Sequence, residues 1–363
     1  MSMELSLHEV SQAGQIRLVA ANVPYNNLQW TRRASKPGEF SALIPGGLPV
    51  PWPGRYLVTV EGQREVGVLE KVGTPEESDG VATTLAGRFA EALWARWEAP
   101  AGGASAKGAN WRQAVTAALS AWHMPDLPPL KLGEGTEAAT GASYSLNANA
   151  GDSAAEAVYR VCEGNGAYPV VSYDRAKAPG SLDVSLVQGL DRTRGQRERP
   201  VWVFSLGMGT AYGVSYSGDY SVACSEVAAY AEKDGAVTSA SAPVPGFDAS
   251  AQWMARAVED VGSLAGDSPT AESVKSAGAL RAYDHRPDVA IDAGVAINAD
   301  VSEAGYGTEW DLGDMVEVEV PSVGLAGAER VEEVRIVCKD GGVTVEASLG
   351  TKHISKIARA SRR

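Results

Sequence analysis

Both ends of the chain carry a strand-like alternation of apolar and polar residues, and this pattern constrains the fold more than any other feature. Near the start, "RYLVTVEGQREVGVLEKV" (residues 55–72) places alternate apolar residues on one face, on each side of a turn at Glu61-Gly62. Near the end, "DMVEVEV" (residues 314–320) alternates valine with glutamate. Successive side chains of a strand point to opposite faces of a sheet, so a period of two predicts half-buried strands. Short strands separated by such turns favour a small barrel or sandwich.

Helical periodicity is concentrated between these two β regions. Three segments there show the apolar spacing of three and four residues that is typical of helices. Asn110 stands where an N-cap is expected for the second helix, and Ser153 with Glu156 forms a capping-box pattern in the third. Two strand-like segments follow, so a small α/β unit is predicted at this point of the chain. The three predicted helices lie within residues 87–100, 110–125 and 151–166.

The charge balance and the apolar runs exclude several classes of protein. The chain has 363 residues, and its 45 acidic residues outnumber 32 basic ones, which gives a formal net charge of -13. Such a surface repels phosphate backbones, so no specific nucleic-acid binding is expected. No apolar run approaches the ~20 residues of a membrane-spanning helix. Residues 1–10 lack the basic region of a secretory signal, so we expect assembly in a cytoplasm.

The cysteines and histidines do not form a metal-binding pattern. The three cysteines are far apart and odd in number, without a CxxC pair, which predicts free, partly buried thiols. No two of the four histidines have the helical spacing of a metal site, and no HExxH sequence occurs. We therefore predict no metal ligands. The residues considered are Cys162, Cys224, Cys338, His8, His123, His285 and His353.

No catalytic or cofactor motif is found either. The glycine cluster Gly207–Gly213 lacks GxGxxG spacing and runs into further strand pattern, so it predicts a tight β connection. There is no GxSxG nucleophile motif, and a glycosidase pair of carboxylates cannot be recognised from sequence. The tryptophans Trp94, Trp97, Trp111 and Trp122 lie on helix stripes, where core packing is expected. We predict a non-catalytic protein without cofactor.

The acidic stretch "WDLGD" (residues 310–314) has two interpretations. The spacing of Asp311 and Asp314 does not match a calcium loop. The structural interpretation is a turn in which Gly313 has a positive φ and the aspartates bind turn amides. The functional interpretation is that Trp310 and the glutamates behind it mark the place where a partner subunit docks.

The strand that follows this turn has a buried and an open face. The valines Val316, Val318 and Val320 are predicted to face a core, and Glu317 and Glu319 to face solvent or a partner. Cross-strand pairing of these glutamates with Arg335 and Lys339 is expected to contribute ~0.2–1 kcal/mol per pair. The last strands are predicted at residues 315–320, 331–339 and 343–348, with a hairpin turn at Asp340-Gly341-Gly342.

Several motifs follow one another in an order that resembles the tail hub proteins of long-tailed phages, often called minor tail proteins in phages of actinobacteria. The resemblance covers residues 1–350, nearly the whole chain. The stretches that carry it are "KPGEFSALIP", "REVGVLEKV", "LAGRFAEALWARWEAP", "QGLDRT" followed by "PVWVFSLGMGTAYGVSYSGDYSVACSEVAAYAE", and "WDLGDMVEVEV" followed by "ERVEEVRIVCKDGGVTVEASLG".

This resemblance implies a mainly β, α+β fold with two related small β-barrel domains and an α/β insertion, shared with the hubs of contractile tails and the type VI secretion spike. A helix is expected to start at Ser268-Pro269 and to reach Ala282. The resulting domain assignment is a first barrel with its terminal helix at 1–98, the insertion at 104–195, a second barrel at 196–235 and 286–350, a linker and helix at 236–285, and a basic tail at 351–363.

The resemblance also implies a structural function at the tip of a virion tail. Such hubs form homotrimers on assembly and contact the distal tail protein ring, the tape measure protein, and fibre or receptor-binding proteins. The basic tail, with five Lys/Arg and no acidic residue, is either a solvated end or a segment that docks on an acidic neighbouring subunit. A negative inner surface of the assembled ring would let DNA pass without sticking.

Two alternative functions remain open at the level of sequence. One is a cell-wall hydrolase that acts at the tail tip, which requires a compact pair of catalytic carboxylates or a metal site. The other is a receptor-binding adaptor, which predicts an exposed aromatic groove.

Overall fold

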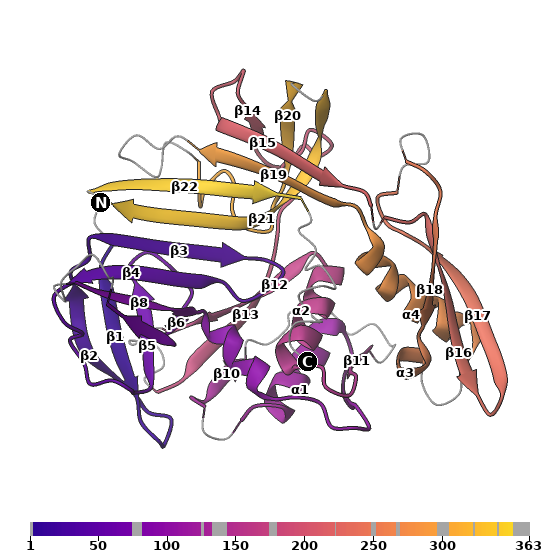
Figure 1. Ribbon diagram of the computed structural model, residues 1–363, viewed down its shortest axis with the longest axis horizontal. Helices are drawn as coiled ribbons and strands as arrows, with labels where there is room; N and C mark the ends of the chain where they lie inside the picture. Colours follow the sequence, from indigo (N-terminus) through magenta and orange to yellow (C-terminus); the bar gives the residue numbers. More distant parts are fainter. Residues whose placement is uncertain are drawn as a thin grey trace. The chain divides into compact units, whose positions relative to one another are not determined.

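The computed structural model separates the chain into two compact units. Unit 1 is formed by Met1–Val214 and Asp292–Leu349, and unit 2 contains Ser215–Ile291. The chain leaves unit 1 along strand β15 (Tyr212–Asp219) and returns along β19 (Asp288–Val295) (Figure 1). The residues that the structure describes are 3–74, 82–124, 127–132, 144–173, 180–221, 223–247, 252–265, 269–295, 305–321, 324–339 and 341–350.

The N-terminal part of unit 1 consists of short antiparallel strands in two sheets. One sheet has the order β2-β1-β5-β6, and its apolar residues alternate as expected, for example Leu5 and Leu7, which are both fully buried. The ring of Trp30 packs on Phe40 and Phe89, with ring centroids 5.7 and 4.6 Å away. The strands are β1 (Leu5–Val10), β2 (Ile16–Val23), β3 (Asn27–Arg33), β4 (Glu39–Pro45), β5 (Tyr56–Val60), β6 (Gly67–Val68), β7 (Lys71–Gly73) and β8 (Ala82–Arg88).

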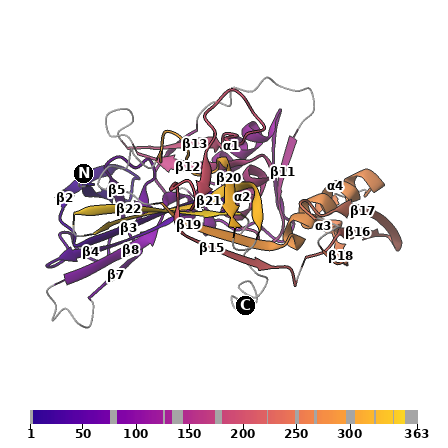
Figure 2. The same cartoon turned by 90° about the horizontal axis from the view of Figure 1, so that it is seen from above.

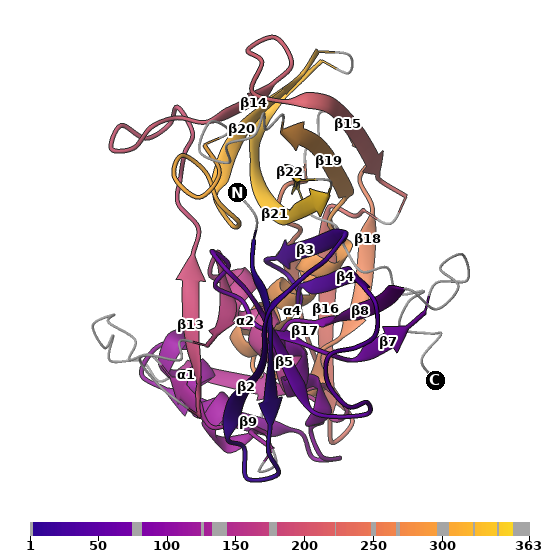
Figure 3. The same cartoon turned by 90° about the vertical axis from the view of Figure 1, so that its left-hand side faces the viewer.

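The second sheet of unit 1 joins the first and the last β regions of the sequence. Its strand order is β15-β19-β22-β21-β3-β4-β8-β7, and β20 and β14 pair beside the first part of β21 (Figure 3). Residues 325–330 of β21 pair with β20, whereas residues 333–339 pair with β3 on one side and with β22 on the other. The strands involved are β14 (Val203–Ser205), β20 (Met315–Val320), β21 (Leu325–Lys339) and β22 (Gly342–Leu349).

The middle of the sequence forms an α/β region with its own apolar core. Two helices begin at the predicted caps: Asn110 accepts the N–H of Gln113, and Ser153 forms a capping box with Glu156. Trp97 stacks on Trp122 with ring centroids 4.6 Å apart. The elements are the 3-10 helix η2 (Ala90–Arg96), β9 (Ala104–Gly108), α1 (Trp111–Ala121), β10 (Leu130–Leu132), β11 (Tyr144–Ala148), α2 (Ala154–Gly164), β12 (Ala167–Ser172) and β13 (Leu182–Gln188).

Unit 2 is a small sheet with the order β17-β16-β18, and helices pack on one of its faces (Figure 2). Small side chains let helix and sheet approach closely: a Cβ on Gly278 would lie 2.6 Å from the Cβ of Ala229. The elements are β16 (Glu226–Lys233), β17 (Ala236–Pro243), β18 (Arg256–Asp260), α3 (Gly262–Ala265), α4 (Ala271–Ala282) and the 3-10 helix η3 (Tyr283–His285).

The predicted α+β fold, mainly β, is confirmed. A closed barrel is not seen among the described strands. Strand β21 instead extends one sheet from the first β region into the last. The helix expected at 87–100 is a 3-10 helix, and its N-cap residue Phe89 makes no side-chain cap bond. The helix that ends at Ala282 starts later than expected, because Thr270 forms the capping box with Ser273. No helix in the described ranges is long and apolar enough to cross a membrane.

Candidate functional site

The turn Trp310–Asp314 connects several segments of unit 1 through polar contacts. Gly313 has φ +85°, as the sequence predicts. Trp310 is fully buried and packs edge-on against Phe204, with ring centroids 5.1 Å apart. Asp314 is 3% exposed. The stretch is therefore an interior turn that precedes β20, and the valines Val316, Val318 and Val320 are buried as predicted.

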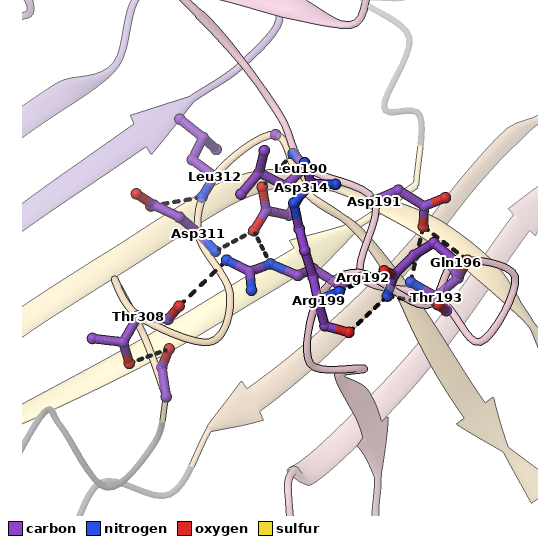
Figure 4. Close-up of polar contacts among 12 residues, drawn as sticks. Leu190, Asp191, Arg192, Thr193, Gln196, Arg199, Thr308, Asp311, Leu312 and Asp314 are labelled. Carbon is purple, nitrogen blue, oxygen red and sulfur yellow. Dashed lines mark hydrogen bonds and ion pairs between the residues drawn. The ribbon is translucent and has the colours of Figure 1, made fainter.

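Asp314 binds the loop that carries "QGLDRT". Its Oδ1 accepts the backbone N–H of Leu190 at 2.7 Å. Its Oδ2 accepts the N–H of Asp311 at 3.0 Å and the Nε–H of Arg192 at 3.3 Å (Figure 4). Burial raises the pKa of Asp314, while the N–H groups of Leu190 and Asp311 and the charge of Arg192 act in the opposite direction. The predicted aspartate-to-amide bonds are confirmed, and they also tie together segments that are distant in sequence.

Close backbone packing accompanies these bonds. A Cβ on Gly189 would lie 1.8 Å from the carbonyl oxygen of Gly313, so the two chains can approach only because residue 189 has no side chain. A Cβ on Gly313 would in turn lie 2.7 Å from the ring of Tyr168. The two glycines thus allow the turn to contact both the 189–193 loop and β12.

Arg32 connects the same turn to the first β region. Its Nη1 donates to Asp311 Oδ1 at 2.6 Å and to the hydroxyl of Tyr306 at 2.7 Å. Its Nε donates to Glu65 Oε1 at 2.6 Å. Burial lowers the pKa of Arg32, but the charge of Glu65 and the groups of Tyr306 and Asp311 raise it well above its ordinary value, so the side chain is charged. We call Arg32, Glu65, Asp311, Asp314 and Arg192 the buried joint.

The buried joint holds parts of unit 1 together and does not form a metal cage. Its two arginines and three carboxylates are drawn from four segments: β3, the residues before β6, the 189–193 loop and the 310–314 turn. Opposite charges meet in hydrogen-bonded pairs, which compensates their burial. Within the described ranges, no group of three or more His, Cys, Asp or Glu could hold a metal ion.

The structure corrects the idea that Trp310 marks a docking place. Trp310 has no exposed surface with which to touch a partner. Glu317 accepts the backbone N–H of Arg194 at 2.7 Å, and Glu319 lies 3.8 Å from the Arg194 side chain. The expected pairing with Arg335 and Lys339 is wrong, because β20 pairs with residues 325–330 of β21 and those two residues lie beyond that range.

Arg335 and Lys339 have other neighbours. The side chain of Arg335 binds Glu346 at 3.3 Å across β21 and β22. Lys339 stands opposite Gly342 and Asn27 at the end of the strand.

The remaining candidate residues are dispersed. Cys162, Cys224 and Cys338 are free and buried, as predicted. The cluster Gly207–Gly213 forms the turn between β14 and β15 and the start of β15, which agrees with a tight β connection.

The histidines are not grouped. His8 binds the Thr59 hydroxyl at 2.9 Å, and His285 binds Glu259 at 2.7 Å. Both ring nitrogens of His123 are buried without a hydrogen-bond partner among the described groups. His353 lies outside the described residues.

Sequence reasoning missed the two arginines of the joint. The only signal was indirect: Arg32 follows the apolar strand residues Leu28 and Trp30, and Arg192 belongs to the "QGLDRT" motif. A buried arginine in a strand requires a partner, but its partners here come from residues up to 279 positions away.

Solved structures with a similar fold cover nearly the entire chain. A tail protein from Neisseria meningitidis has a TM-score of 0.60 at 15% identity, and covers 97% of each chain. The 43 kDa tail protein of prophage MuSo2 from Shewanella oneidensis has a TM-score of 0.60 at 13% identity, covering 96% of this chain and 98% of its own. The fold is that of phage tail proteins.

A third structure extends this tail-protein fold to another bacterium. The prophage tail protein gp18 from Listeria monocytogenes has a TM-score of 0.56 at 9% identity and covers 99% of this chain and 97% of its own. No protein-family model and no curated protein matches the sequence. Identities of 9–15% establish the tail-protein fold and leave function to be argued from the chain itself.

Proposed function

We propose that this chain is a structural, non-catalytic tail hub of a phage or prophage, located at the virion tail tip and assembled in the host cytoplasm. The observation that carries the proposal is the tail-protein fold over 96–99% of this chain, shared with tail proteins from three bacteria. The order of the sequence motifs supports the same function.

The hub proposal includes the two-barrel organisation at 1–98 and at 196–235 with 286–350, the insertion at 104–195, and assembly as a homotrimer. The proposed partners are the distal tail protein ring, the tape measure protein, and fibre or receptor-binding proteins. Exposed apolar side chains that gather on one surface mark protein interaction sites, and the turn after β14 in unit 1 carries two of them close together in sequence. Leu206 and Met208, in the turn after β14, are 52% and 59% exposed.

The buried joint explains how a hub could keep its shape under load. A tail tip must transmit force between the tube and the host surface, and this requires segments that do not separate. The joint ties β3 to the 310–314 turn through Arg32 and Asp311, and ties that turn to the 189–193 loop through Arg192 and Asp314. Both are hydrogen bonds between charged groups, which are stronger than those between neutral groups.

The hub proposal is tested by locating the protein in purified virions and by measuring its complexes. We expect immunogold labelling at the tail tip, and co-purification with the distal tail protein and the tape measure protein of the same phage or prophage. Absence from virions together with no affinity for either protein would overturn the proposal. A monomer in isolation is compatible with it, because neighbouring tail proteins can drive assembly.

The catalytic alternative has a separate assay. A zymogram on host cell walls should show no clearing by the purified chain. Clearing that is lost when one pair of acidic residues is replaced would establish the hydrolase instead.

A further inference from the structure

A small cavity lies beside the buried joint, between the first β region and the α/β region. It is lined by Arg32, Glu65, Glu91, Tyr159 and Tyr168, together with apolar groups such as Phe89. Its volume of ≈ 10 Å³ is of the order needed to hold one water molecule.

Two of the carboxylates that line this cavity, those of Glu65 and Glu91, each have one oxygen without a hydrogen-bond partner among the described groups. Glu65 is 4% exposed, and its Oε1 accepts the Nε–H of Arg32 at 2.6 Å. Glu91 is 2% exposed, and its Oε1 accepts the backbone N–H of Val171 at 2.6 Å. The Oε2 atoms of Glu65 and Glu91 are both buried without a hydrogen-bond partner among the described groups. A buried polar atom left in this state costs about 1–3 kcal/mol.

The two carboxylates differ in their access to positive charge. Glu65 forms an ion pair with Arg32. The hydrogen bonds to Glu91 come from backbone N–H groups. Burial raises the pKa of Glu91 to about 8, and the negative charge of Glu65 acts in the same direction. Since Oε1 of Glu91 accepts the N–H of Val171, a proton on this carboxyl belongs on Oε2, the oxygen without a partner among the described groups.

We propose that the cavity is a binding site for one water molecule, which accepts a hydrogen bond from the protonated Oε2 of Glu91 and donates one to Oε2 of Glu65. This arrangement gives both unused oxygens a partner. It also links η2 and β12, which Glu91 already joins through Val171, to Glu65 and Arg32 of the first β region. The bound proton and the water thereby extend the buried joint toward the α/β region.

The other titratable and charged groups at the cavity are compatible with a neutral Glu91. Arg32 and Arg33 belong to β3, and Arg33 pairs with Glu39 and Glu333 at 2.6 Å. Tyr159 of α2 and Tyr168 of β12 have pKa values that burial raises above the ordinary value, so their hydroxyls stay protonated. If Glu91 lost its proton, its anion would face that of Glu65 across the cavity, with Arg32 already paired.

The proposal predicts a specific dependence of stability on pH. The carboxyl of Glu91 ionises near 4.5 when exposed and near 8 in the folded protein. Below pH 4.5 both states hold the proton, and between the two values only the folded state holds it. Stability conferred by this proton is therefore lost as the pH rises through that window, by about tenfold in the folding equilibrium constant per pH unit.

The first test compares wild type with Glu91→Gln, using denaturant unfolding of the full chain from pH 5 to pH 9. A glutamine keeps the acceptor for Val171 and places an N–H donor where the proton stood, so it should remove the decline between pH 5 and pH 8. The control, Glu98→Gln, makes the same change at an exposed residue near the end of the same segment and should keep the wild-type profile. Identical pH profiles for wild type and Glu91→Gln would overturn the proposal.

The second test needs no variant to fold. Infrared spectra of the wild-type chain should show the C=O stretch of a buried protonated carboxyl at pH 7, which disappears above pH 8. A high-resolution crystal structure at pH 7 should show one water between the Oε2 atoms of Glu65 and Glu91. Absence of the infrared band, or a cavity without that water, would overturn the proposal. Neither result depends on whether the chain is found in virions, so this test is independent of the proposed hub function.

Discussion

The carboxylate of Asp314 accepts the backbone N–H of Leu190 at 2.7 Å, across 124 positions of sequence. The contact joins the turn before β20 to the loop that enters the last β region, and the carbonyl of Gly313 rests against Gly189 at the same place. A turn that looks from its sequence like an acidic binding loop is thus a connection between two distant segments of unit 1.

Asp314→Asn should destabilise the folded protein. An asparagine retains one acceptor, so either the bond from Leu190 or the pair with Arg192 and Asp311 is lost inside the protein. We expect a loss of about 1–3 kcal/mol in the free energy of unfolding, measured with denaturant. The matched control Asp191→Asn alters an exposed side chain that bonds only locally to Thr193, and should change the stability by less than about 0.5 kcal/mol.

Gly189→Ala should be disruptive for a purely steric reason. The added Cβ would stand 1.8 Å from the backbone oxygen of Gly313, which cannot move as a side-chain end could. Overpacking of this kind costs about 1–3 kcal/mol or more. Gly195→Ala, two residues beyond the 189–193 loop, places its Cβ 3.4 Å from the Thr193 hydroxyl, an ordinary contact. A melting temperature that falls equally in both variants would contradict the close approach.

Arg32→Met should be among the most damaging single substitutions. It leaves the carboxylates of Glu65 and Asp311 without their cation, one of them fully inside the protein. Removing one partner of a buried pair costs about 3–5 kcal/mol. Arg17→Met removes an exposed pair with Glu9, where the side chains are 76% and 42% exposed, and should cost about 0–1 kcal/mol. The comparison uses chemical denaturation at pH 7.

Glu70→Gln and Glu91→Gln should change the pH dependence of folding stability in opposite directions. Two hydrogen bonds from the Arg88 side chain, at 2.6 and 2.9 Å, lower the pKa of Glu70 below 4.5. A carboxyl whose pKa is lowered by folding stabilises the folded state when the pH is above the pKa of the unfolded chain. This contribution is lost as the pH falls through the pKa of the folded protein. The pair is half exposed, so we expect about 1 kcal/mol or less at pH 7. A double-mutant cycle with Arg88→Gln should give a coupling that decreases as the pH falls through the lowered pKa of Glu70 in the folded protein.

The double variant Leu206→Ser/Met208→Ser should separate folding from assembly. Both side chains are exposed, so the unfolding free energy should stay within about 0.5 kcal/mol of wild type. Under the hub proposal, co-purification with tail partners or incorporation into virions should fall. Val237→Ser, which removes a 62% exposed side chain from β17 of unit 2, is the matched control and should leave incorporation unchanged. Normal incorporation of the double variant would exclude the β14–β15 turn as a contact.

Local sequence signals determined the elements of this protein well. The caps at Asn110 and Ser153, the positive φ of Gly313 and the buried valines of β20 each depend on a few neighbouring residues, so periodicity and capping rules were sufficient. The same rules failed where a competing local bond was available, as at Thr270, whose hydroxyl begins α4.

Tertiary structure alone decided how those elements meet. Whether Glu317 would pair with Arg335 or with Arg194 depended on which part of the long strand β21 lies beside β20, and a pattern with a period of two does not encode that register. The sequence also did not predict that Arg32 contacts Asp311, or that Glu91 and Glu65 line the same cavity. These charged residues form hydrogen-bonded pairs because they are buried together, and burial also raises the pKa of Glu91. Burial depends on how the whole chain packs, so local sequence patterns do not predict it.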